Sequence, residues 1–217
     1  MFTWKIGMAI ATGNTLVIKP AEETPLTGLY LASLLKEAGF PAGVVNVING
    51  HGHTVGAVLA LHNDVDKIGF TGTEEVGHKI LEMSGKSNLK RVGLELGGKS
   101  PFIIFNLNDT DLRRAAGDAA FSMFTNQGQS CCASSSIFVH ESVYEKFIEY
   151  SKEIAENLVV GDPFASTTTQ GSLVNKENFE RVLAYIESGK KQGARLVCGG
   201  SRVGTRGYFV QPTIFGS

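Results

Sequence analysis

Cys131 and Glu95 are the two residues of this 217-residue sequence whose types and surroundings suggest covalent chemistry. Cys131 ends the stretch Gln127–Cys131, which we expect to be an irregular, glycine-containing break between helical patterns. Free backbone N–H groups at the start of a following helix would favour its nucleophilic thiolate form. An isolated cysteine is more often a small buried hydrophobic residue, and the neighbouring Cys132 is expected to point elsewhere. The residue type alone leaves both interpretations open.

A thiolate in an enzyme needs a partner that handles protons. None of the five histidines is placed to suggest a Cys-His dyad, although sequence separation does not exclude one (His51, His53, His62, His78, His140). Glu95 follows an expected strand, between Leu94 and Leu96, where parallel-sheet enzymes place working residues. An apolar setting there would suit this carboxylate to accept a proton from water or a thiol. Burial statistics favour the alternative, a solvated glutamate at a strand end.

Two further segments have the residue types of a nucleotide site. Phe70–Gly77 joins an expected strand to a helix, so its N–H groups can bind a phosphate, although Thr73 as a simple helix cap explains it equally well. Lys19 and Glu22 follow another strand, where a carboxylate can accept hydrogen bonds from ribose hydroxyls. A solvated turn is the alternative for this pair.

The elements that must position these residues alternate between short β-branched runs and helical patterns, which indicates an α/β chain with a parallel sheet. The first strands are expected at residues 15–19, 44–48, 65–70 and 91–94. The first helix has Thr24 as N-cap, Pro25 at the first helical position and Gly39 as its stop, and further helices cover residues 55–61 and 74–83.

The run from Gly97 to Pro101 marks a boundary between two parts of the chain. The second part is expected to contain helices at residues 110–123, at 143–158 and around 179–186. Its strands are expected at residues 102–105, 136–140, 195–198 and 208–211.

Composition narrows the class of protein. The 20 basic and 21 acidic residues nearly cancel and form no long charge run, so no nucleic-acid partner is expected. No apolar run approaches the roughly 20 residues of a membrane span. Three cysteines, two of them adjacent, form neither a disulfide framework nor a metal-binding pair, so we expect a reducing compartment and no metal. No signal peptide follows Met1, which favours the cytoplasm, with the mitochondrial matrix as the alternative.

Four segments together resemble the aldehyde dehydrogenase superfamily in their order and approximate spacing: Ile18–Glu22, Phe70–Thr73, Leu94–Pro101 and Gly128–Cys131. The resemblance covers essentially the whole chain and is strongest to retinal and acetaldehyde dehydrogenases. It implies a partial, Rossmann-like cofactor-binding domain at residues 1–97 and a partial catalytic α/β domain at residues 98–217. It also implies that Cys131 attacks the aldehyde carbon to give a thiohemiacetal and then a thioester, and that Glu95 activates the water that hydrolyses the thioester.

The resemblance further implies a bound NAD. Gly72 and Thr73 match the family's pyrophosphate contacts, and Lys19 and Glu22 match its adenosine-ribose contacts. Because Glu22 would repel a 2′-phosphate, NAD is favoured over NADP. The same resemblance implies cofactor contacts at two further positions, Gly77 and Leu96.

The expected substrate is a small, hydrophobic aldehyde, because Trp4 and Phe124 resemble the aromatic residues that line the family's substrate tunnel. The family's oxyanion-hole asparagine would lie before Met1, and its nicotinamide-ribose segment would follow Gly216. We therefore expect this chain to be part of a longer enzyme that is a homodimer or homotetramer, and the chain alone to be impaired. A non-catalytic, crystallin-like protein of the same fold is the alternative, and a semialdehyde or betaine aldehyde dehydrogenase is a third possibility.

Overall fold

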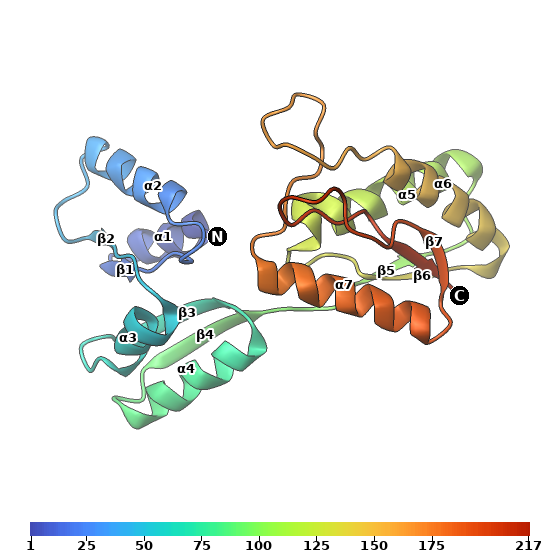
Figure 1. The fold of residues 1–217 in the computed structure, drawn as a ribbon. Helices are drawn as coiled ribbons and strands as arrows, with labels where there is room; N and C mark the ends of the chain where they lie inside the picture. The colour runs from blue at the N-terminus through green and yellow to red at the C-terminus, as the bar shows by residue number, and fades with distance from the viewer. The chain divides into compact units, whose positions relative to one another are not determined.

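The computed structural model describes residues 1–217, which divide into two compact units, Met1–Leu96 and Gly97–Ser217 (Figure 1). Both units alternate helices with strands, and three of the four strand pairs are parallel. The predicted α/β class is therefore confirmed. The assignment of the two parts to cofactor binding and to catalysis stays a prediction.

The first unit contains four strands and four α-helices. In chain order they are α1 (Phe2–Ala11), β1 (Leu16–Ile18), α2 (Leu26–Glu37), β2 (Val45–Val47), the single π-helical turn η1 (Gly52–Gly56), α3 (Ala57–Leu61), β3 (Lys67–Gly72), α4 (Glu74–Lys86) and β4 (Arg91–Leu96).

Strand pairing in this unit differs from the expected single sheet. β1 pairs with β2 and β3 pairs with β4, both in parallel, but β2 and β3 share no ladder, so the unit holds two two-stranded sheets. β1 and β2 are only three residues long, which leaves few backbone groups to pair with a further strand. The predicted parallel pairing is confirmed, with the four strands divided between two sheets.

Helix ends in the first unit agree only in part with the local sequence signals. Gly39 has φ +85°, the left-handed conformation expected after a helix end. Thr24 is not the N-cap of α2, because Pro25 occupies that position and the amide of Thr24 instead donates to Ala21 O in a turn. Helix α1 was not predicted at all.

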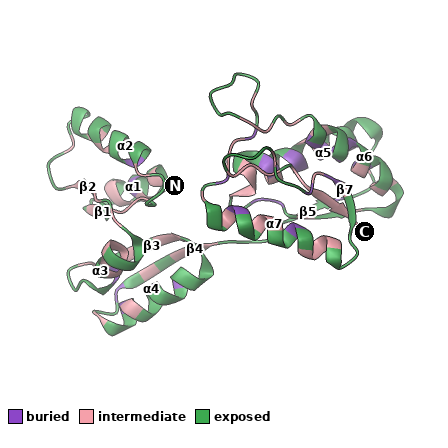
Figure 2. Ribbon diagram, in the orientation of Figure 1, coloured by how far each residue is buried: buried purple, intermediate pink, exposed green.

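The second unit contains β5 (Pro101–Ile104), α5 (Asp109–Phe124), the 3₁₀ turn η2 (Thr125–Gly128), β6 (Ser136–Val139), the 3₁₀ turn η3 (Glu141–Val143), α6 (Tyr144–Glu156), α7 (Lys176–Lys191), β7 (Arg195–Cys198) and β8 (Ile214–Gly216). Its main core lies between β5, α5 and α6, and most of the buried residues gather in this unit (Figure 2). Burial of Leu112 and Phe147, each 2% exposed, supplies much of the apolar area that holds the two helices together.

The strand predicted at residues 208–211 is wrong. Only Val210 forms an isolated antiparallel bridge, to Arg202, and the strand that pairs with β7 is β8 instead. Gly207 with φ +69° precedes the segment and Pro212 follows it, so its backbone is interrupted on both sides.

Candidate active site

The Cys131 thiol lies on an exposed turn after η2 in the second unit. No helix begins there, so the expected contribution of helical N–H groups to this thiol is wrong. The turn lies close to the backbone of Gly98, because a Cβ on that glycine would stand 3.0 Å from Cys131 O. The glycine before Lys99 therefore allows the segment that starts the second unit to approach the cysteine turn.

The residues before Cys131 have a strained backbone. Asn126 (φ +53°) and Gln127 (φ +57°) are left-handed without being glycine, and Gly128 (φ +71°) continues the run. Each non-glycine residue in this conformation costs on the order of 1 kcal/mol or more and persists only where its surroundings hold it.

The side chain of Gln129 makes hydrogen bonds that stabilise this backbone conformation. Its Oε1 accepts hydrogen bonds from Val174 N (2.9 Å) and Asn178 Nδ2 (3.0 Å), and its Nε2 donates to Asn126 O (3.0 Å). One side chain thus ties the strained turn to the start of α7, more than 40 residues later in the chain. Sequence reasoning placed Gln129 in the motif and missed this role, for which the sequence offers no local signal.

The three cysteines have different surroundings. Cys132 is also exposed, and its Sγ lies 3.3 Å from Ser130 Oγ, whereas no hydrogen bond involves the Cys131 thiol. Cys198 is buried, and this burial raises the pKa of its thiol. Of the three, Cys198 matches an inert structural cysteine, and Cys131 is the exposed thiol without a competing partner.

Glu95 lies on β4 of the first unit, in register with Thr71 on β3. Its side chain is exposed within this unit, so the expected apolar setting is wrong here. Lys5, from α1, donates a hydrogen bond to Thr71 Oγ1 (3.0 Å). Burial lowers the pKa of Lys5, and the negative charge of Glu95 acts in the opposite direction. A carboxylate is the residue type that can take a proton from water as a general base. The sequence did not indicate this role of Lys5, because helix α1 was not predicted.

Lys19 and Glu22 come together beyond the end of β1. Lys19 Nζ lies 3.3 Å from Glu22 Oε2 and also donates to Pro20 O (2.6 Å) and Gly50 O (3.2 Å). The pKa of Glu22 is lowered, first by a hydrogen bond from its own backbone amide and further by Lys19 and by the amide of Gly52. Glu22 is therefore an ionised acceptor with spare lone pairs, which suits the hydroxyl donors of a ribose.

Thr73 caps the N-terminus of α4, because its side chain accepts from Val76 N at 3.4 Å. Gly72 ends β3 immediately before it, so both residues lie where helix amides can bind a phosphate. The chemistry of these two residues, like that of Lys19 and Glu22, is of the kind that a dinucleotide needs.

Gly77 and Leu96 pack against each other. A Cβ on the buried Gly77 would stand 3.1 Å from Leu96 Cδ2, so the glycine allows α4 to pack closely on β4. The geometry assigns this pair to helix–strand packing, and their predicted contact with a cofactor stays a prediction.

The two aromatic residues expected in a substrate tunnel lie in different units. Trp4, on α1, is 64% exposed and is free to face a ligand. Phe124 is only 9% exposed, because it packs with Ala120, Ala155 and Cys198 in a core cluster. Within its own unit Phe124 is a core residue. Its role in a substrate tunnel stays a prediction.

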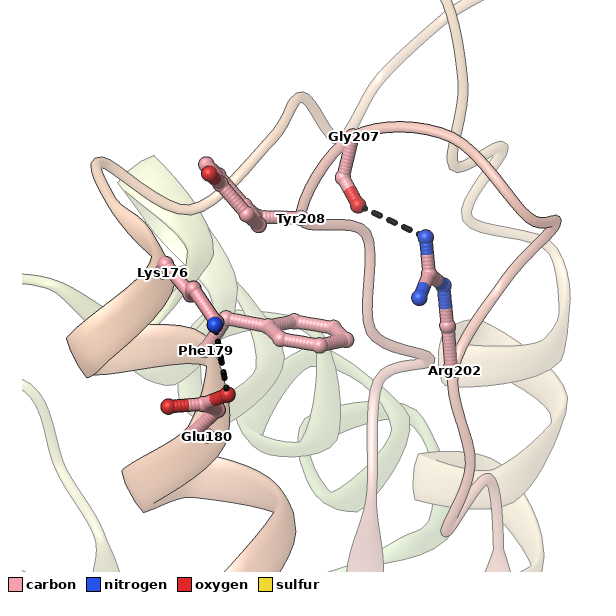
Figure 3. A pocket seen from close by; sticks show the side chains of 6 residues that line it. All are labelled: Lys176, Phe179, Glu180, Arg202, Gly207 and Tyr208. Carbon is pink, nitrogen blue, oxygen red and sulfur yellow. Dashed lines mark hydrogen bonds and ion pairs between the residues drawn. The ribbon is translucent and has the colours of Figure 1, made fainter.

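A surface pocket of about 380 Å³ lies at the start of α7, away from every predicted site residue. Figure 3 shows its lining: Lys176, Phe179, Glu180, Arg202, Gly207 and Tyr208. The Arg202 guanidinium lies 5.3 Å from the Phe179 ring centre and donates to Gly207 O (3.1 Å). Lys176 pairs with Glu180 at 3.6 Å, so the polar groups of the pocket are largely engaged with one another.

None of the helices combines the length and the apolar character that crossing a bilayer requires. No three histidine, cysteine, aspartate or glutamate side chains gather closely enough to ligate a metal ion.

Comparison with known proteins decides the family. The sequence profile described as "Aldehyde dehydrogenase family" matches residues 1–217. The chain belongs to the aldehyde dehydrogenase family. It is 56% identical over 216 residues to the mitochondrial aldehyde dehydrogenase of Sus scrofa, covering 100% of this chain and 41% of that protein. It is 55% identical over 215 residues to aldehyde dehydrogenase 1A1 of Mesocricetus auratus, covering 99% and 42%.

Solved aldehyde dehydrogenases share the fold. An NAD⁺ complex of an aldehyde dehydrogenase from Bacillus cereus superposes with a TM-score of 0.92 at 48% identity, over 98% of this chain and 43% of that one. An indole-3-acetaldehyde dehydrogenase in complex with NAD⁺ gives a TM-score of 0.93 at 45% identity, over 98% and 43%. The chain thus spans about two-fifths of the length of these aldehyde dehydrogenases. The relatives include proteins named mitochondrial and cytosolic, so they leave the compartment of this one undecided.

Proposed function

We propose that the protein containing this chain oxidises an aldehyde to a carboxylic acid with NAD as the hydride acceptor, and that Cys131 is its nucleophile. The observation that carries the proposal is the exposed Cys131 thiol on a strained turn held by Gln129, in a chain of the aldehyde dehydrogenase family. Strain at one turn, supported from a distant helix, is typical of a functional site.

The residue types supply a balanced sequence of steps. The thiolate of Cys131 adds to the aldehyde carbon, and the resulting thiohemiacetal loses a hydride and becomes a thioester. NAD, when bound, accepts that hydride. Glu95 takes a proton from water, the water oxygen attacks the thioester carbon, and the carbon–sulfur bond breaks to release the acid and the thiolate. A soft sulfur nucleophile suits this order, because its adduct can lose hydride and its thioester remains reactive to water.

The proposed cofactor contacts are those whose chemistry fits a dinucleotide. Glu22 would accept hydrogen bonds from the adenosine ribose, with Lys19 beside it, and the amides at Gly72 and Thr73 would bind the pyrophosphate. Since an ionised Glu22 repels a 2′-phosphate, we propose NAD rather than NADP as the preferred cofactor. Two solved relatives that contain NAD⁺ support this choice.

The proposed substrate is a hydrophobic aldehyde, with Trp4 as the accessible aromatic residue beside its path. We further propose that the whole protein is a homo-oligomer and that it works in a reducing compartment, the cytoplasm first and the mitochondrial matrix second. Exposed thiols at Cys131 and Cys132 favour such a compartment, because an oxidising one would modify them.

The test uses the protein encoded by the complete reading frame that contains these residues, with acetaldehyde or retinal as substrate and NADH formation as readout. C131A should abolish the reaction, whereas C132A and C198A, the matched controls, should leave most of it. E95Q should give one rapid burst of NADH per active site and then a steady rate lower by about 10²–10⁴-fold, because only thioester hydrolysis needs the base. Equal NADH formation by C131A and C132A would show that the nucleophile is another residue. NAD binding without any turnover would favour the crystallin-like alternative.

A further inference from the structure

A second titratable side chain lies beside Glu22. His51 Nδ1 is 3.7 Å from Glu22 Oε1, and the amide of the next residue, Gly52, donates to the same oxygen at 3.5 Å. The other carboxylate oxygen, Oε2, lies 3.3 Å from Lys19 Nζ. Each oxygen of this carboxylate therefore has a neighbour that is a cation or can become one.

The backbone fixes the position of His51. Gly50, just before it, has φ +152°, and a Cβ there would collide with Val55. The carbonyl of His51 accepts from Thr54 N (3.2 Å) and Gly56 N (3.4 Å) at the start of η1. Its ring stacks on His53 with the ring centres 5.4 Å apart and the planes 20° apart. The imidazole is thus held near Glu22 while its side chain remains 66% exposed and able to exchange protons.

The charge of this cluster depends on His51. With a neutral imidazole, the Lys19 and Glu22 charges cancel; with a protonated imidazole, the cluster carries one net positive charge. A 2′-phosphate, the group that distinguishes NADP from NAD, brings close to two negative charges. A neutral cluster leaves Glu22 free to repel that phosphate, and a positive one offsets the repulsion.

We infer that His51 is a specificity-determining residue for the nucleotide: neutral, it leaves Glu22 to select NAD, and protonated, it admits the 2′-phosphate of NADP. This inference rests on the proposed NAD-linked function, and it concerns the discrimination between two nucleotides rather than the reaction itself. The groups that face His51 are Glu22 and the stacked His53, with Lys19 on the far side of the carboxylate.

The direction of the pH effect follows from ordinary histidine chemistry. Histidine is the side chain whose charge ordinarily changes near neutral pH and is positive on the acid side, so the ratio of the Kd for NADP to the Kd for NAD should fall as the pH decreases. One added charge near a dianion at a water-exposed edge changes that ratio by roughly tenfold at low ionic strength. The 2′-phosphate itself gains a proton near pH 6, which also reduces its repulsion by Glu22, so some fall of the ratio is expected even in a variant that lacks His51.

The experiment measures the Kd of NAD⁺ and of NADP⁺ by titration calorimetry, at about pH 5.5 and about pH 8 and at low salt. It uses the protein of the complete reading frame, as wild type, H51Q and H62Q. His62 lies at the end of α3, where its Nδ1 accepts from Asp64 N, and it is not among the groups that contact Glu22, so H62Q is the matched control. Because H51Q leaves the ligand and His53 unchanged, its difference from wild type isolates His51.

The expected result is a Kd ratio that falls about tenfold more between the two pH values in wild type and H62Q than in H51Q. The same pH response of the ratio in all three proteins would overturn the inference while leaving the proposed function intact. Failure of both nucleotides to bind at either pH would overturn the proposed function, and the inference with it.

Discussion

Replacing Gln129 with leucine tests whether the strained turn before Cys131 is held from α7. The change preserves the approximate volume of the side chain and removes three hydrogen bonds of 2.9–3.0 Å, to Val174 N, Asn178 Nδ2 and Asn126 O, and a longer one of 3.4 Å to Gln127 Oε1. At about 1 kcal/mol net for each of the three shorter bonds, the loss is about 3 kcal/mol. That is of the same order as the cost of two left-handed non-glycine residues, so the turn should relax once these bonds are gone.

The predicted loss is large enough for two assays. About 3 kcal/mol would lower the Tm of a chain of this length by roughly 6–12 °C, and the shift is smaller in the longer, complete protein that the burst assay needs, because the entropy of unfolding grows with length. A displacement of the thiol by about 1 Å should lower the NADH burst rate, which reports attack by Cys131, by about 10²-fold. The matched control is Gln192→Leu, because Gln192 makes a single exposed side-chain bond, to Ser188 Oγ (2.9 Å), near the end of α7.

Two results would refute the reasoning in different ways. An unchanged Tm in Gln129→Leu would show that the hydrogen bonds contribute no net stability. A lowered Tm with an unchanged burst rate, once measured well below the new Tm, would show that Gln129 stabilises the fold without positioning Cys131. Gln129→Glu separates the contacts further, because it keeps an acceptor for Val174 N and Asn178 Nδ2 and removes the donor to Asn126 O.

Three further predictions concern the fold. Lys90 is buried and donates to Ala60 O (2.7 Å) near the end of α3. Lys90→Met should therefore lower the free energy of unfolding by about 1–3 kcal/mol in urea titrations. The control Lys79→Met breaks only an exposed pair and should change the free energy of unfolding by less than about 1 kcal/mol. The pKa of Asp109 is lowered, first by a hydrogen bond from Lys146 and then by one from Tyr150. The stability that the ionised Asp109 contributes is therefore present above about pH 3.9 and is lost as the pH falls through the lower pKa of the folded state. Acid titrations of Asp109→Asn should lack this loss of stability. Gly199→Ala should lower the melting temperature far more than Gly204→Ala in calorimetry. Both residues have positive φ, but only at Gly199 would a Cβ collide with a backbone carbonyl, that of Pro212. Equal melting temperatures would contradict this account.

Local sequence signals were sufficient where a single turn of chain decides the structure. Thr73 before a helical pattern and Gly39 after one behave as cap and stop, because both roles depend on the residue's own hydrogen-bonding group or φ preference. The alternation of strands and helices likewise predicted parallel pairing, since a crossover helix returns the chain in the same direction.

The failures have physical reasons. In α1 the apolar residues Phe2, Trp4 and Ile6 alternate, which has no helical period, and only Ile6 is buried in the helix that forms. Residues 208–211 have strand-like side chains, but tertiary packing uses one of them differently: the Tyr208 ring packs against Phe179, with ring centres 5.8 Å apart. The separation of β2 from β3 depends on tertiary geometry that no pairwise pattern contains.

The candidate site shows the same division between local and distant information. Cys131, Glu95 and Glu22 are predicted from short motifs, because chemistry restricts the residue types that can act as nucleophile, base or ribose acceptor. Their supporting groups are distant in sequence: Gln129 acts on a segment 45–49 residues away, Lys5 on one 66 residues away, and His51 lies 29 positions after Glu22. Such partners adjust position and charge without performing a step. Substituting them should therefore change rates, pH profiles and nucleotide preference, whereas substituting Cys131 should remove the reaction itself.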